Sequence, residues 1–228
     1  MIMKLASTLL AIAVLAFTAS AQQVKPLVVS SDQPAPNDDG GQAFILSSDL
    51  QPFSSFRHLR KANISEPQQY SIFVGESWAN STLQAREAQL QSLLANVSNE
   101  ADLIALEDSG IKNRFGPTAS LERLGVAAGR FTDLDAQRVI AAMLDEAVLP
   151  RPNSKAIYVI FLDASLQSAL GSLVAGKHYA AYHNAFNHSG ANIRYVVVPF
   201  ASDEATGYQI ALRAFVAAAL RPARAAAK

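Results

Sequence analysis

The segment Ala156-Ile157-Tyr158-Val159-Ile160-Phe161-Leu162 decides the fold class of this chain. Every position in it is apolar, so a strand built from it is hydrophobic on both faces. Such a strand is typical of the centre of a sheet that helices cover on each side. A second β-branched run, residues 193–199, ends at a proline, and residues 205–220 form an alanine-rich segment that predicts a closing helix.

Upstream of this strand, apolar spacing predicts alternating strands and helices. We expect strands at residues 70–75 and 125–131. Helices are expected over 82–97, over 100–107, and after the N-cap sequence at 132–135, the last being stopped by the prolines of residues 150–152. This alternation predicts an α/β fold with a layered, mostly parallel central sheet flanked by helices. We assign residues 69–222 to one domain and expect residues 223–228 to fray.

The amino-terminal region has the pattern of an export signal. Lys4 precedes an apolar run and an Ala-Ser-Ala exit at residues 19–21, which predicts a signal peptide over 1–21. The apolar run is shorter than the ~20 residues that span a bilayer. We therefore expect an extracytoplasmic protein, secreted or periplasmic, without a stable membrane anchor after cleavage. Residues 22–68 are rich in Pro, Ser, Gln and Asp and predict a flexible or turn-rich leader, with a short strand at 43–46.

The composition excludes several classes of function. Nineteen basic and 19 acidic side chains give a formal net charge of zero, and we expect no nucleic-acid partner because phosphate binding normally requires a basic surface. The chain has no cysteine, which excludes disulfides and thiolate sites. It also lacks the glycine-rich phosphate-binding motifs and the G-x-S-x-G nucleophile turn. We expect no cofactor.

Polar groups follow three of the predicted strands. Glu76 and Trp78 come after the first strand, Asp163 after the central one, and Asp203 with Glu204 after the last. Ligand sites in open α/β sheets lie beyond the carboxyl ends of the strands. These residues are therefore candidates for ligand binding, although capping of the next element explains a lone acid equally well.

Three of the four histidines lie in one segment, as His178, His183 and His188. Their spacing of five does not match the spacing of four that aligns two ligands on a helix, so they are weak candidates for a metal site that a loop would have to gather. Tyr182 and Phe186 lie between them. Together with Trp78 they are candidate aromatic anchors for a ligand, with burial in the core as the alternative.

Four segments in order resemble the exported Exordium family, also called phosphate-induced proteins. They are residues 70–78, 157–162, 182–186 and 193–199, and the resemblance extends over roughly residues 70–220. It implies a secreted or wall-associated protein linked to growth, without implying a reaction. Family members often carry a helix resembling S-H-E-L-x-E after the last strand, which invites comparison with zincin metal sites. Here Tyr208, Gln209 and Leu212 replace its histidine and two glutamates, and this trio lacks the donors for a zinc site.

The sequence and the resemblance predict a non-catalytic extracellular or envelope factor. Its expected partner is a cell-wall polysaccharide or an envelope protein, and Glu76, Trp78, Asp163, Tyr182 and His183 are the candidate binding residues. The alternative is a metal-dependent hydrolase with a site around His183, joined by Glu76 or Asp163.

Overall fold

The computed structural model describes residues 43–47, 62–112, 119–124 and 129–220. The predicted signal peptide, most of the predicted leader and the predicted frayed tail lie outside the described residues. Within the leader, residues 44–46 form the short strand that the sequence predicts.

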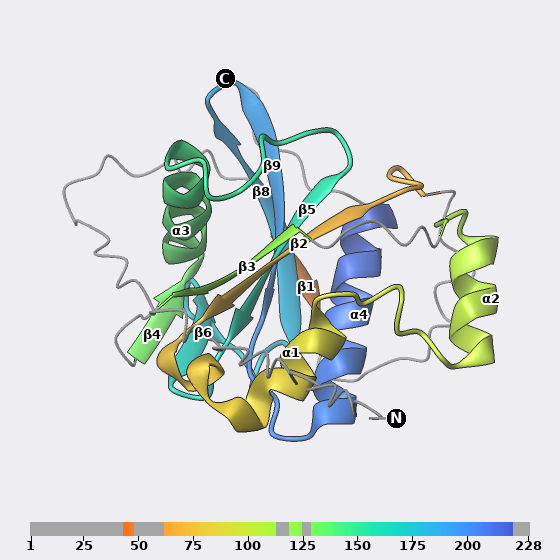
Figure 1. The fold of residues 1–228 in the computed structure, drawn as a ribbon, viewed down its shortest axis with the longest axis horizontal. Coiled ribbons are helices and arrows are strands. Elements are labelled where there is room, and N and C mark those ends of the chain that lie inside the picture. The colour runs from red at the N-terminus through yellow and green to blue at the C-terminus, as the bar shows by residue number, and fades with distance from the viewer. Residues whose placement is uncertain (1–42, 48–61, 113–118, 125–128, 221–228) are drawn as a thin grey trace, which may run out of the picture.

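The main sheet has six strands in the order β1-β8-β9-β5-β2-β3 (Figure 1). Strands β9, β5, β2 and β3 run parallel to one another, whereas β8 is antiparallel to both β9 and β1. The bounds of these strands are Phe44–Leu46 for β1, Gln68–Val74 for β2, Ala119–Leu124 for β3, Ala156–Leu162 for β5, Ala181–His188 for β8 and Ala191–Val198 for β9. The prediction of a mostly parallel sheet is therefore wrong, since the sheet is mixed.

A tight hairpin between β8 and β9 causes the antiparallel half of the sheet. Ser189 and Gly190 alone connect the two strands, and both have positive φ, at 49° and 79°. Two central residues with positive φ give the turn whose twist matches antiparallel strands. The predicted α/β class holds, but the chain enters the last parallel strand through this hairpin instead of through a helix.

A second sheet lies beside the first and contains β4 (Gly129–Thr132), β6 (Leu166–Leu170) and β7 (Leu173–Val174). Strand β4 pairs parallel to β6, and β6 pairs antiparallel to β7. The strand predicted over 125–131 is present only as β4, and its first four residues lie outside the described part of the chain.

The helices match the predictions except in their ends. Of the predicted helix over 82–97, only α1 (Gln84–Leu90) is α-helical, and residues 91–96 form turns. Two 3-10 turns precede α1, namely η2 (Glu76–Ala79) and η3 (Ser81–Leu83). Helix α2 spans Glu100–Asp108 and α4 spans Glu204–Leu220. Helix α3, Asp133–Asp145, begins with a capping box of Thr132 and Asp135. It ends before the prolines because Ala147 turns the backbone out of the helix at a φ of 54°.

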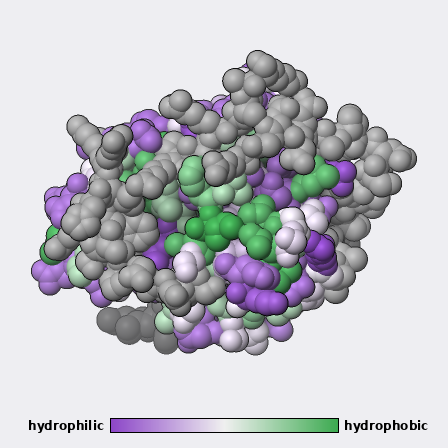
Figure 2. Space-filling model, turned by 180° about the vertical axis from the view of Figure 1, so that it is seen from behind, coloured by the Kyte–Doolittle hydropathy of each residue, from purple (hydrophilic) through white to green (hydrophobic). Residues whose placement is uncertain are grey.

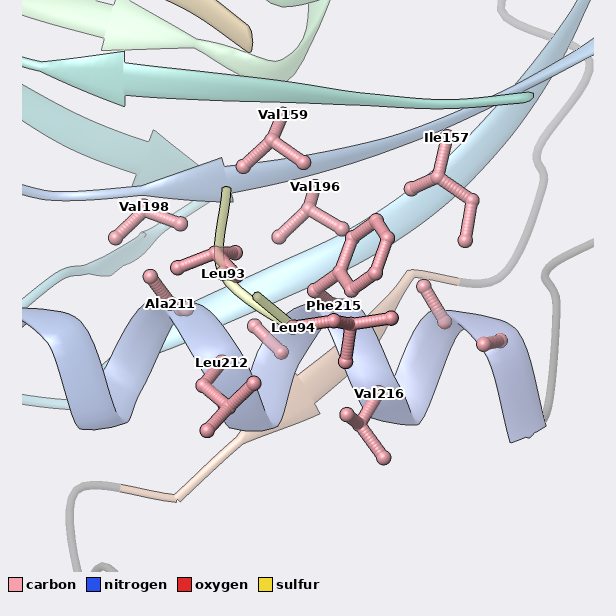
Figure 3. Packing of buried hydrophobic residues seen from close by; sticks show 14 of the residues in the cluster. Leu93, Leu94, Ile157, Val159, Val196, Val198, Ala211, Leu212, Phe215 and Val216 are labelled. Atoms are coloured by element: carbon pink, nitrogen blue, oxygen red, sulfur yellow. The ribbon is translucent and has the colours of Figure 1, made fainter. Parts of the chain in front are cut away.

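Buried apolar side chains cover both faces of the main sheet. On one face α4 packs over β5 and β9, and Figure 3 shows Phe215 of α4 directed toward Ile157 and Val196 of these strands. On the other face α3 and the second sheet cover the alternate residues, including Ile160 and Tyr195. All seven residues of β5 are buried, as its continuous apolar sequence predicts.

In the described part of the chain, no helix combines the length and the hydropathy needed to cross a membrane. Four large apolar side chains are about 40% exposed, namely Phe44 and Ile45 on β1 and Leu103 and Ile104 on α2. Figure 2 shows a face of the molecule on which hydrophobic and hydrophilic residues lie side by side.

Candidate functional site

The carboxyl ends of β2 and β5 bring two loops into contact. The chain leaves β2 toward α1, which contacts α4, and leaves β5 toward β6, which contacts α3. Neighbouring parallel strands whose connections leave on opposite faces of the sheet are where ligand crevices form in α/β folds. The residues at this edge therefore form the candidate site.

Asp163 ties these two loops together. Its Oδ2 accepts a hydrogen bond from the backbone N–H of Ser77, at 2.9 Å. Its Oδ1 accepts from the backbone N–H of Ser165, at 2.9 Å, and from the Oγ–H of the same residue, at 2.6 Å. The side chain is fully buried, so the carboxylate has exchanged water for donors from both loops.

Gly75 makes this arrangement possible. Its φ is 114°, and a Cβ at this position would lie within 3.0 Å of three carboxylate atoms of Asp163. The carboxylate therefore packs directly on the glycine backbone at the end of β2. Burial raises the pKa of Asp163, but the hydrogen bonds from Ser165 and Ser77 outweigh it and hold the pKa below its ordinary value of 3.8. The group remains an anion at neutral pH.

Trp78 and Phe200 connect this edge to the end of β9. Trp78 is only 1% exposed, and its ring packs edge-on against Phe73 and Phe200, at centroid distances of 4.9 and 6.1 Å. Of the three polar segments predicted to share one edge of the sheet, those after β2 and β5 are joined by the Ser77–Asp163 hydrogen bond, and the third follows Phe200, which Trp78 contacts. Trp78 itself is a core residue and does not present its ring to a partner.

Arg86, on α1, is a further residue of this edge that the sequence interpretation missed. Its guanidinium lies over the ring of Phe200, 4.5 Å from the centroid, and a Cβ on Gly207 would lie 2.5 Å from its Nη2. Burial lowers the pKa of Arg86, and the charges of Glu204 and Asp203 partly offset this effect. The sequence does contain a signal for the burial of Arg86. It lies three residues after Leu83 and four before Leu90, on the apolar face of the predicted helix.

The charge of the edge is negative. Glu76, Asp203 and Glu204 are exposed carboxylates, and Asp163 and Arg86 add one buried charge of each sign. The carboxylate of Asp203 accepts a hydrogen bond from the backbone N–H of Thr206, at 2.7 Å, and thereby caps α4. Capping, one of the two alternatives given for such an acid, is therefore the role that the structure shows for Asp203.

The histidines do not converge. His183 and His188 lie on β8, where residues five apart point to opposite faces of the sheet. The ring of His183 stacks on Phe44 at 5.0 Å, whereas His188 Nε2 lies 2.8 Å from Asp145 Oδ1. His178 accepts a hydrogen bond from the backbone N–H of Val174. Among the described residues, no three acids or histidines lie close enough to hold a metal ion.

Tyr182 and Phe186 are also core residues, at 1% and 2% exposure. They lie on the face of β8 that α3 covers, beside the carboxylate of Asp133. Burial, and then the charge of Asp133, raise the pKa of Tyr182 well above its ordinary value. The aromatic residues expected to anchor a ligand are therefore used for packing.

Asp133 is the second polar centre of the molecule and was not predicted as one. Its Oδ1 accepts a hydrogen bond from the Tyr195 hydroxyl, at 2.6 Å, and its Oδ2 accepts from the side-chain amides of Gln137 and Asn184, each at 3.1 Å. This carboxylate thus joins the first turn of α3 to β8 and β9. Asn184 and Gln137 are buried, and their bonds to Asp133 explain how polar residues fit the core.

Tyr208, Gln209 and Leu212, on α4, have different surroundings. The Tyr208 hydroxyl donates to the backbone carbonyl of Leu93, at 2.8 Å, and burial raises the pKa of Tyr208 to about 12. Leu212 is fully buried, and Gln209 is partly exposed. Tyr208 therefore joins α4 to the turn after α1 and remains a protonated donor.

Comparison with protein-family models, with curated proteins and with solved structures gives no match. The function of this site therefore has to be inferred from its geometry. That geometry is an edge where three loops meet, locked by Asp163 and flanked by exposed carboxylates and hydroxyls.

Proposed function

We propose that the protein is an exported, non-catalytic factor of the envelope or extracellular space, similar to Exordium proteins, that binds a neutral wall polysaccharide at the carboxyl edge of its sheet. The observation that carries this proposal is the locked edge itself. Asp163 holds the loops after β2 and β5 in one arrangement, so Glu76, Ser77 and Ser165 are presented to solvent from a rigid base. Carboxylate and hydroxyl groups are suited to the hydroxyls of a sugar.

The segments that resemble the Exordium family support treating this region as one unit. They fall on β2 with η2, on β5, on β8 and on β9. In the sheet these strands are consecutive, in the order β8-β9-β5-β2. Segments far apart in the sequence thus lie side by side. The segments on β2, β5 and β9 end at or near the proposed binding edge, whereas the segment on the antiparallel β8 begins near it.

The negative charge of the edge favours a neutral ligand over an acidic one. Four carboxylates face a single guanidinium there, so a polyuronate would meet like charge. Hydroxyl groups avoid this repulsion, because they donate to carboxylates and accept from the serine and arginine donors.

The residues required by the hydrolase alternative are dispersed, which favours the binding role. Asp163 is engaged by three donors at the edge, whereas His183 stacks on Phe44 of β1. A general base and a metal ligand would have to face one substrate atom. The elements that carry these side chains keep them in separate contacts.

Sedimentation with insoluble polysaccharides tests the proposal. The purified protein is incubated with a neutral β-glucan and, separately, with an acidic polyuronate, and the bound fraction is measured. We expect retention on the neutral polymer and a bound fraction lowered about tenfold by Glu76→Lys. The matched control is Glu107→Lys, on an exposed position of α2, because α2 contributes no residue to the edge.

Two results would contradict the proposal. Failure of the wild-type protein to bind any envelope polysaccharide would remove the function, and retention only through an envelope protein would change its partner. Stoichiometric zinc in the purified protein, lost in His183→Ala, would instead support the hydrolase alternative.

A further inference from the structure

His183 connects the edge strand β1 to the rest of the sheet. Phe44 of β1 is paired with His183 in register, and the two rings stack with an interplanar angle of 11°. His183 is 4% exposed although it lies next to the last strand of the sheet. A strand of only three residues, Phe44–Leu46, thus covers one face of its ring through Phe44.

Among the residues that the structure describes, no charged group is placed to compensate a proton on this imidazole. Its register partner on β9 is Val196, which packs in the apolar cluster under α4, so His183 faces that same cluster. Strand β1 contributes only Phe44, Ile45 and Leu46.

On α4 the residues of the cluster are apolar apart from Tyr208, whose hydroxyl bonds to Leu93 and stays neutral, and the charge of Arg213 interacts with Asp102. The neighbours of His183 on its own strand, Tyr182 and Asn184, point to the opposite face, toward Asp133. Within the described residues, Nδ1 of His183 has no hydrogen-bond partner. Desolvation alone lowers the pKa of His183 from 6.5 to about 4.

We propose that β1 is an acid-released edge strand, held on β8 only while the imidazole of His183 is neutral. Protonation places an unpaired cation between the ring of Phe44 and the apolar cluster under α4, where a charge without a partner is costly. Release of β1 exposes the ring to water and frees the backbone edge of β8. The docking of β1 thereby becomes a sensor of acidity.

The sign of the effect follows from linkage. The docked state binds the proton less tightly than the released state, so docking is most stable above pH 6.5 and weakens as the pH falls toward 4. If the ring recovers its ordinary pKa on release, the ratio of released to docked protein rises about 30-fold between pH 7.5 and about pH 5.

A single introduced cysteine measures this ratio, because the chain contains none. Ile45→Cys carries a nitroxide at a 43% exposed position of β1, and its spectrum gives the mobile and immobile fractions. The same label on Leu103→Cys, on α2, reports events elsewhere, and the fluorescence of the buried Trp78 reports the folded state. We expect the mobile fraction at residue 45 to rise with acid while the two controls stay constant.

Variants distinguish the protonation of His183 from other effects of acid on β1. His183→Leu should abolish the response of the label at residue 45, and His188→Gln, which changes a histidine paired with Asp145, should leave it intact. Phe44→Ala weakens docking and should move release to higher pH. If His183→Leu does not fold, the test is whether Phe44→Ala moves the release of β1 to higher pH. The proposal is wrong if residue 45 stays immobile, if His183→Leu responds like the wild type, or if all probes change together.

Discussion

Replacing Gly75 with alanine should destabilise the protein by about 2–6 kcal/mol. Two effects add at this position. The φ of 114° with a ψ of 152° is a conformation that residues with a Cβ adopt only at a cost of about 1–3 kcal/mol. The new methyl group would also overlap the carboxylate of Asp163, and overpacking of this kind costs about 1–3 kcal/mol.

Gly129→Ala separates the two effects. Gly129 also has a positive φ, at 142°, but a Cβ there would meet nothing within 4 Å. We therefore expect Gly129→Ala to show the backbone cost alone, about 1–3 kcal/mol. Urea unfolding followed by the fluorescence of Trp78 gives the free energies of unfolding for both variants.

A double-mutant cycle then tests the contact itself. Asp163→Ala removes the carboxylate, so Gly75→Ala should cost less in that background than in the wild type, by about 1–3 kcal/mol. Equal costs in both backgrounds, or a Gly75→Ala cost no greater than that of Gly129→Ala, would refute the packing of Asp163 on Gly75. The locked edge would then lose its structural basis.

Three further predictions concern the two carboxylate centres and the cap of α3. Tyr195→Phe should lower the free energy of unfolding in urea by about 1–2 kcal/mol, because it removes a 2.6 Å hydrogen bond to Asp133; an unchanged value would contradict a stabilising role for that bond. Thr132→Ala should cost about 1 kcal/mol through loss of the capping box, measured in the same way, with Thr132→Ser as the tolerated control. Asp163 stabilises the fold at neutral pH and loses that effect as the pH falls through its lowered pKa. Asp163→Asn should therefore flatten the acid side of the curve of stability against pH, and an unaltered acid side would contradict the assignment.

The strands that the sequence predicts well are those in which local and tertiary preferences agree. Strand β5 is apolar throughout and is buried throughout, and the N-cap of α3 forms as its Thr and Asp residues indicate. Strand β8 was missed because His183 and Asn184 make its sequence look like a loop. Only tertiary contacts, the stack on Phe44 and the bond to Asp133, show how these polar residues are buried.

A signal for the antiparallel hairpin was present in the sequence. Ser189-Gly190, shortly before the β-favouring run of residues 193–198, is a two-residue turn pattern. Its consequence for the topology is large, because it replaces an expected parallel crossover. Strand β3 gave a contrary signal, since its sequence, Ala-Ser-Leu-Glu-Arg-Leu, contains good helix formers.

For the candidate site, the sequence predicted that these loops lie at one edge of the sheet, but it did not predict the contacts that hold them there. The positions of Asp163 and of the loops after β2 and β9 follow from the rule for carboxyl ends of strands. The roles of Gly75 and Arg86 depend on contacts between residues distant in the sequence, which spacing does not reveal. Trp78, Tyr182 and Phe186 were candidates for a surface and are packed inside.

The pairing of β2 also sets the order in which the chain can assemble. Gln68 of β2 pairs with Ala156 of β5, so when the full chain folds, the centre of the sheet closes only after a long intervening segment has been brought back. The β8–β9 hairpin needs only its two-residue turn and forms far sooner. Until β5 joins β2, the apolar faces of both strands remain open to aggregation, and the time spent in that state is set by loop closure and not by the final stability.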